Sequence, residues 1–227
     1  MRYFILFILI ILFNLPLFAH VFPIPEDKEV SFDVIRKNKI IGNLTMKFIN
    51  EDKNLILHSV LDIDVKILFI PAYKFFQETR ETWSDGNFVS IDGFTDFEDD
   101  REYKIDGKDE NGKFKVTGMD GPLELNENII PLNYWNKNML YEEEVFDTQK
   151  GIVRKISVKK FENEKIKVNN IKVDTEKYRF NASENPKDKG PFPQYTLWYS
   201  NNELLKMEFQ NPKDKKIITI IRNDWEK

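Results

Sequence analysis

The side chains best suited to acid–base and metal chemistry are scarce in this chain. It has no cysteine and only two histidines, His20 and His58. Thiolate nucleophiles and thiolate metal sites are therefore excluded. A catalytic zinc site normally needs two or more histidines, and His20 would lie at or next to the chain terminus after cleavage, so zinc is not expected. His58 lies on the polar side of an alternating segment, and no Gly-x-Ser-x-Gly motif accompanies it, so a Ser-His-Asp triad is not expected. We predict no catalytic residue, no metal site and no cofactor.

Carboxylates are the remaining candidates for chemistry. An acidic run covers residues 96–102, and residues 106–112 combine Asp, Glu and Lys with two glycines. Paired carboxylates can supply the acid and base of a glycosidase, and oxygen ligands can hold Ca²⁺. The first run lacks ligand spacing, and in the second Gly107 would fall on the first calcium-ligand position. We interpret the first as a solvated turn and the second as a hairpin turn, and keep a carboxylate-based hydrolase as an alternative.

Aromatic side chains give the stronger signal for binding. They make up 14% of the chain and include four tryptophans, which is enough to fill a large core or to line a concave sheet. A curved sheet lined with aromatic rings can hold an apolar or sugar-like molecule. We predict ligand contacts from seven aromatic residues: Phe69, Tyr73, Trp83, Tyr134, Trp135, Trp198 and Tyr199.

Residues 67–76 form an unusual connection between two alternating runs. Polar turn residues are expected at such a place, yet all but Pro71 and Lys74 are apolar or aromatic. If exposed, this segment would mark a partner, a membrane or the mouth of a ligand site. We expect it instead to cap one end of a barrel as part of the core, and keep exposure as the alternative.

The elements that must position these residues are strands. Apolar and polar residues alternate with a period of two over residues 30–34, 44–48 and 55–65, which predicts three strands of a meander. Asp85-Gly86 and Asn111-Gly112 suit tight hairpins because these residues accept a positive φ.

Little of the chain suits any other element. Residues 126–140 predict one short helical or irregular segment, and residues 183–193 form the clearest loop. We predict a single antiparallel β domain over residues 20–227. Its sheet of about a dozen strands should be strongly curved and form a half-barrel or barrel.

Residues 1–19 have the pattern of an export signal. Arg2 precedes an apolar run from Tyr3 to Phe13, and Ala19 is a small residue where a signal peptidase could cut. The run is shorter than the roughly 20 apolar residues of a bilayer-spanning helix. We predict cleavage after Ala19 and a periplasmic or secreted protein with no transmembrane span. An uncleaved anchor is the alternative.

The charge balance bears on partners. The chain has 34 Lys and Arg against 38 Asp and Glu, a net charge of −4, and no basic block. Nucleic acid binding needs a concentrated cationic face, so we expect no nucleic acid partner. The same balance argues against strong overall attraction to anionic lipid headgroups. The composition does not decide the oligomeric state.

Five short segments, in order, resemble a family of exported bacterial proteins known only as a domain of unknown function. The resemblance covers about residues 30–222, and each motif is weak alone. It implies a periplasmic or secreted antiparallel β-protein and implies no activity. The segments are Phe32-Asp33-Val34 with Ile41-Gly42, Glu81-Thr82-Trp83-Ser84-Asp85-Gly86, Tyr134-Trp135-Asn136, Asp147-Thr148-x-x-Gly151 and Leu197-Trp198-Tyr199.

Together these observations favour an exported, non-enzymatic β-protein. We expect it to bind an apolar small molecule or a lipid in the concave face of its sheet. An envelope assembly or interaction protein, which would bind another envelope protein, is the first alternative. A carboxylate-based hydrolase is the second.

Overall fold

The structure is a computed structural model that describes residues 29–67, 70–97, 101–126, 128–188, 191–211 and 214–225. The expected signal peptide and Phe69 lie outside these residues. Within the described ranges, no helix is both long enough and apolar enough to cross a membrane.

The described chain folds as 15 antiparallel strands of one sheet, with a single turn of 3₁₀ helix, η1 (Lys137–Tyr141). This confirms the predicted all-β antiparallel meander and the short helical segment predicted near 126–140, although η1 ends one residue later, at Tyr141. The strands are β1 (Glu29–Arg36), β2 (Lys39–Glu51), β3 (Asn54–Ile67), β4 (Ile70–Ser84), β5 (Asn87–Phe97), β6 (Arg101–Asp109), β7 (Lys113–Gly118), β8 (Gly121–Asn126), β9 (Glu144–Asp147), β10 (Ile152–Lys160), β11 (Glu164–Val168), β12 (Ile171–Ala182), β13 (Tyr195–Ser200), β14 (Glu203–Gln210) and β15 (Ile217–Arg222).

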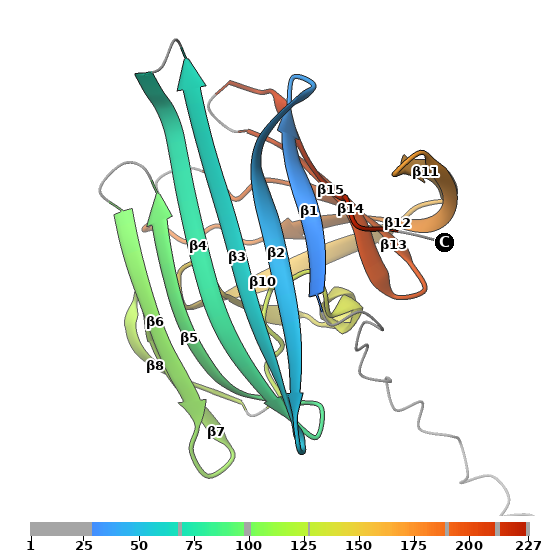
Figure 1. Cartoon of the computed structure of the whole chain (residues 1–227). Helices are drawn as coiled ribbons and strands as arrows, with labels where there is room; N and C mark the ends of the chain where they lie inside the picture. The colour runs from blue at the N-terminus through green and yellow to red at the C-terminus, as the bar shows by residue number, and fades with distance from the viewer. Residues whose placement is uncertain are drawn as a thin grey trace, which may run out of the picture.

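The sheet is a meander whose two halves are joined by the first and last strands. Its order is β8-β7-β6-β5-β4-β3-β2-β1-β15-β14-β13-β12-β10-β9, with β11 paired to β12. The pairing of β1 with β15 sets Phe32 opposite Arg222 and Arg36 opposite Ile218. A twisted sheet of this size curls, and Figure 1 shows β10 and β12–β14 crossing behind β1–β6.

The core lies on the inner face of the curled sheet, and strand alternation selects it. In β1, Val30, Phe32 and Val34 are buried while the residues between them are partly exposed. The segment between β8 and β9 enters the same core and adds Trp135 and Met139. Each such side chain contributes about 1.5–3 kcal/mol when buried, so the alternation fixes which face is inside.

Two glycines allow the ends of the sheet to meet without closing it. A Cβ on Gly118, at the end of β7, would lie 2.3 Å from the carbonyl oxygen of Gly151, in the turn between β9 and β10. Beside them the Met119 amide donates to the Lys150 carbonyl at 2.7 Å. The β7–β8 turn therefore rests on the β9–β10 turn, although β8 and β9 do not pair.

The segment 67–76 is mostly strand, so its interpretation as a connection was wrong. Strand β3 runs to Ile67 and β4 begins at Ile70. Aromatic residues such as Tyr73 and Phe75 favour a pleated, half-buried surface, which explains the extension of the hairpin. The 183–193 loop is confirmed, because its described residues contain no strand.

The contact between Gly118 and Gly151 predicts a position-specific loss of stability. Gly118→Ala places a methyl group against backbone, so we expect the free energy of unfolding to fall by about 1–3 kcal/mol or more. Gly93→Ala is the matched control, because its added Cβ would lie 3.5 Å from the nearest atom. Urea unfolding measures both variants. Equal effects of the two substitutions would contradict the close contact.

Candidate functional site

A cavity of about 420 Å³ lies inside the curled sheet. Strands β2–β6 supply one wall and β13–β15 another. The rest comes from residues 132–134, from residues 147–150 with Arg154, and from Asp188 and residues 191–193 of the loop before β13. Small-molecule sites in proteins commonly have volumes of about 300–1,000 Å³. This cavity is therefore the first candidate for a functional site.

Strand β4 contributes every second residue to the cavity. Tyr73, Phe75, Gln77, Thr79 and Glu81 all line it, because alternate side chains of a strand point to the same face. The series begins with aromatic rings near the start of β4 and becomes polar further along the strand. Strand β4 therefore makes one end of the cavity aromatic and the other end polar.

Most of the wall from the other strands is apolar. Leu61 and Ile63 of β3 face the cavity from one side, and Met207 and Ile220 face it from the other. Ile63, Met207 and Ile220 are buried, and Leu61 is half-buried. This part of the cavity suits a hydrocarbon chain or ring.

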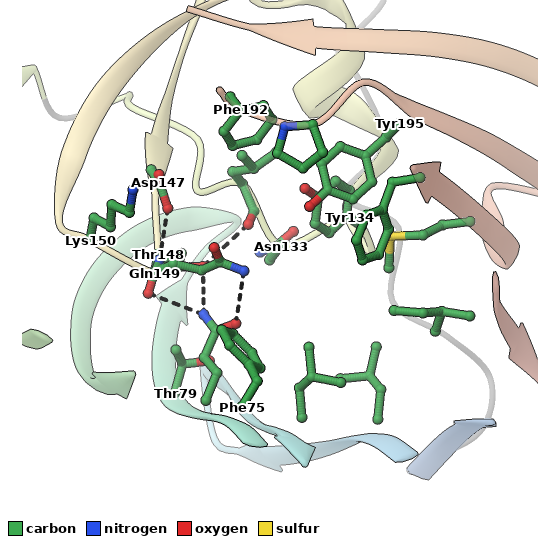
Figure 2. Close-up of a pocket in the computed structure, with 18 of the residues that line it drawn as sticks. Phe75, Thr79, Asn133, Tyr134, Asp147, Thr148, Gln149, Lys150, Phe192 and Tyr195 are labelled. Atoms are coloured by element: carbon green, nitrogen blue, oxygen red, sulfur yellow. Dashed lines mark hydrogen bonds between the residues drawn. The ribbon is translucent and has the colours of Figure 1, made fainter. Parts of the chain in front are cut away.

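Hydrogen bonds organise a polar side. The Gln77 amide donates to the Thr148 carbonyl at 3.2 Å and accepts from Gln149 at 3.4 Å, and the Thr148 hydroxyl donates to the Leu132 carbonyl at 3.2 Å. These bonds tie β4 to the β9–β10 turn across the sheet. Figure 2 shows Asp147, Thr148, Gln149 and Lys150 on one side of the cavity and the rings of Tyr134 and Tyr195 on another.

A buried ion cluster anchors the loop that covers part of the cavity. Arg154, only 1% exposed, donates to Asp147 at 2.6 Å and to Asp188 at 2.9 Å. Lys150 pairs with the same Asp188, and the Phe192 ring lies 4.8 Å from the Arg154 guanidinium. Burial raises the pKa of Asp188, but hydrogen bonds from Arg154 and Lys150 outweigh this and hold it at about 2.

Glu81 is a buried carboxyl group at the polar end of the β4 series. Its Oε2 accepts hydrogen bonds from the Trp83 indole at 3.0 Å and from the Asn133 amide at 2.9 Å. Burial raises the pKa of Glu81 to about 7, and the hydrogen bonds from Asn133, Trp83 and Trp135 only partly oppose it. The group can therefore gain or lose a proton near neutral pH inside the cavity.

Tyr134 holds a strained backbone beside the cavity. Its φ is +61°, a region that bulky residues rarely adopt, and its carbonyl accepts a hydrogen bond from the Tyr199 hydroxyl at 2.7 Å. Its ring packs against Tyr195, with 5.2 Å between centroids. Backbone strain of this kind persists only where the surrounding contacts hold the residue in place, and it often occurs at binding sites.

The predicted ligand-contact residues occupy three environments. Tyr73 and Tyr134 line the cavity. Trp83 and Trp135 pack edge to face in the core, with 5.5 Å between their ring centroids, and Tyr199 is fully buried. Trp198 lies outside the inner core cluster, where its indole bonds Glu164 and the Lys206 ammonium sits 4.5 Å from its ring.

The sequence prediction did not include the polar lining residues. Glu81 shares the inner face of β4 with Trp83, since the two are separated by one residue. Arg154 likewise lies between Ile152 and Ile156 on an alternating strand. For both Glu81 and Arg154, the sequence places a charged residue at a position where the alternation of the strand predicts a core residue.

The other candidates for chemistry lie away from the cavity. His58 is half-buried and bonds Glu78 at 2.7 Å. Residues 106–109 belong to β6, and only residues 110–112 form the hairpin turn. In the part of the chain that the structure describes, no group of three or more Asp, Glu and His is placed to hold a metal ion.

The titration of Glu81 predicts a pH-dependent stability. The pKa of Glu81 is about 7 in the folded chain, against 4.5 for a glutamate that is not buried. Between these two pH values the folded protein therefore binds more protons than the unfolded protein. The free energy of unfolding therefore falls as pH rises through this window, by about 3 kcal/mol. Glu81→Gln stays neutral and should lack this loss. Urea unfolding of both proteins below and above the window checks it, and parallel pH profiles would contradict it.

The ion cluster predicts a large cost for removing its central cation. Arg154→Met leaves Asp147 and Asp188 buried with fewer partners, and such losses cost about 3–5 kcal/mol. Arg179→Met, on the exposed side of β12, is the matched control and should cost less than about 1 kcal/mol. Urea midpoints measure the difference. A similar, small effect of both substitutions would show that the cluster does not stabilise the fold.

Comparison with known proteins identifies relatives of the fold. A β-barrel-like protein of domain of unknown function DUF1849 from Brucella abortus superposes with a TM-score of 0.59 at 14% identity, over 87% of this chain and 98% of that one. A presumed exported protein with a YmcC-like fold from Bacteroides fragilis gives a TM-score of 0.38 at 12% identity, over 91% and 98%. A presumed lipoprotein from Parabacteroides distasonis gives 0.39 at 11%, over 90% and 97%.

The first of these supports the β-barrel-like architecture and carries no information on activity. No curated protein matches the sequence. The sequence profile of domain of unknown function DUF6134 matches residues 32–222, which include all the strands that line the cavity. This chain therefore belongs to the DUF6134 family.

Proposed function

We propose that this protein is an exported, non-enzymatic binding protein that holds an apolar small molecule or a lipid chain in its cavity. The observation that carries the proposal is the cavity of about 420 Å³ itself, with an apolar wall and an ordered polar side. Such a combination buries a hydrocarbon portion and orients a polar group.

The energetic cost of the cavity supports this proposal. Side chains that line an unfilled space lack packing partners on one side, so keeping this volume unfilled forgoes stabilising contacts. Larger side chains at Leu61 or Met207 would recover some of these contacts. A fold that maintains such a space against this cost is suited to binding.

The polar groups favour binding over hydrolysis. Glu81, Asp147 and Asp188 are the carboxylates among the residues that line the cavity. Asp188 is paired with Arg154 and Lys150. Asp147 is held by Arg154, and Glu81 by Trp83 and Asn133. These partners suit a fixed polar wall that receives a ligand's hydroxyl or carboxyl group.

The proposed location rests on the N-terminal pattern. Residues 1–19 resemble a signal peptide, and the absence of cysteine in the chain suits a β-protein stabilised by packing alone in an oxidising compartment. An apolar ligand also needs a protein carrier when it crosses an aqueous compartment.

Filling the cavity is expected to weaken binding without unfolding the protein. Leu61→Trp and Met207→Trp add bulk to the apolar wall, so the affinity for the fluorescent probe N-phenylnaphthylamine should fall about tenfold or more, which is about 1.4 kcal/mol. Ile40→Trp is the matched control, because Ile40 is 65% exposed and lies outside the cavity. Probe fluorescence titration gives the affinities, and thermal unfolding confirms the fold.

The same preparations test for a natural ligand. Protein isolated from its own compartment is examined by native mass spectrometry, and we expect an added mass that Leu61→Trp lacks. Wild-type protein that is consistently free of added mass and binds no probe would overturn the proposed function.

A further inference from the structure

Several hairpins gather at one end of the curled sheet. Neighbouring strands run antiparallel, so the connections β1–β2, β3–β4 and β5–β6 lie at the same end (Figure 1). The pairing of Arg36 with Ile218 brings the β14–β15 connection to that end as well. Along the rim, the β3–β4 and β14–β15 hairpins therefore flank β1–β2.

The mouth of the cavity lies at this end. Its half-buried lining residues include Phe97 and Arg101, on either side of the β5–β6 connection, and Asn211, directly after β14. Pro191, from the loop before β13, is exposed. Glu81, 11 residues along β4 from Ile70, is buried at the deeper part. The cavity thus opens where the hairpins gather.

Two exposed isoleucines share one outward patch beside this mouth. Ile40 is 65% exposed and Ile217 is 51% exposed. Ile40 pairs with Ile35 of β1, and Ile35 pairs with Thr219, two residues from Ile217. Cross-strand partners and every second residue point to one face, so these isoleucines flank β1 on the outer face, with strands about 4.8 Å apart.

Lysines surround the two isoleucines. Lys37 and Lys39 lie in the β1–β2 hairpin, and Lys215 and Lys216 directly precede β15. All four are exposed, and the neighbouring Asp214 is paired with Arg36. We call this set the basic corner: Lys37, Lys39, Ile40, Lys215, Lys216 and Ile217. Its positive charge is a local feature, since the whole chain has a net charge of −4.

We propose that the basic corner docks on the surface of an anionic phospholipid membrane and turns the cavity mouth toward it. Exposed aliphatic side chains ringed by lysines match an interface where acyl chains lie beneath anionic headgroups. Docking does not depend on which molecule occupies the cavity.

Vesicle co-sedimentation tests this surface. Exported protein is mixed with vesicles of phosphatidylglycerol and phosphatidylethanolamine, or of phosphatidylcholine alone. We expect binding to the anionic vesicles that weakens in high salt. Lys39→Glu/Lys216→Glu and Ile40→Ser/Ile217→Ser should each weaken it about tenfold or more. The matched control, Lys167→Glu/Lys172→Glu, reverses two exposed cross-strand lysines of the β11–β12 hairpin and should bind as the wild type does.

The outcomes separate docking from ligand binding. All variants share the same N-terminal processing, so differences between them report the substituted residues alone. Basic-corner variants that lose vesicle binding but retain N-phenylnaphthylamine binding support docking. Retained vesicle binding in both basic-corner variants, or no vesicle binding by the wild type, overturns it. Absent probe binding with intact, corner-dependent vesicle binding overturns the proposed function alone.

Discussion

The pairing of β1 with β15 is the constraint on which the rest of the structure depends. It joins the two halves of a long meander into one sheet, and the inner face of that sheet then has to enclose a single interior. The ends come close enough for Gly118 to touch Gly151, but β8 and β9 do not pair. The sheet is thus curled tightly enough to enclose a volume that its inner side chains do not fill.

Polar groups in this interior are stabilised mainly by one another. Arg154 bridges Asp147 and Asp188, and this bridge attaches the loop before β13 to the sheet. Unpaired charges at such depth would cost several kcal/mol, so the cluster must be complete for the loop to stay in place. The same cluster forms part of the cavity wall, so the packing of the loop and the shape of the site depend on each other.

The fold was predictable from sequence because two-residue alternation and Asp-Gly or Asn-Gly turns are local signals. Hairpins β4–β5 and β6–β7 turn at Asp85-Gly86 and Asn111-Gly112 as expected. The site was predictable only in part, because its lining depends on which distant strands face one another. Tyr73 and Tyr134 could be selected as aromatic candidates, but nothing local to Asp188 indicates its pairing with Arg154.

We propose that the interior of the curled sheet is a binding site for an apolar molecule. The decisive test is a crystal structure of protein isolated from its own compartment without added ligand. We expect continuous elongated electron density between Leu61 and Met207, with any polar group directed to Gln77, Glu81 or the β9–β10 turn. An interior that holds only ordered water, or whose walls have collapsed onto each other, would contradict it.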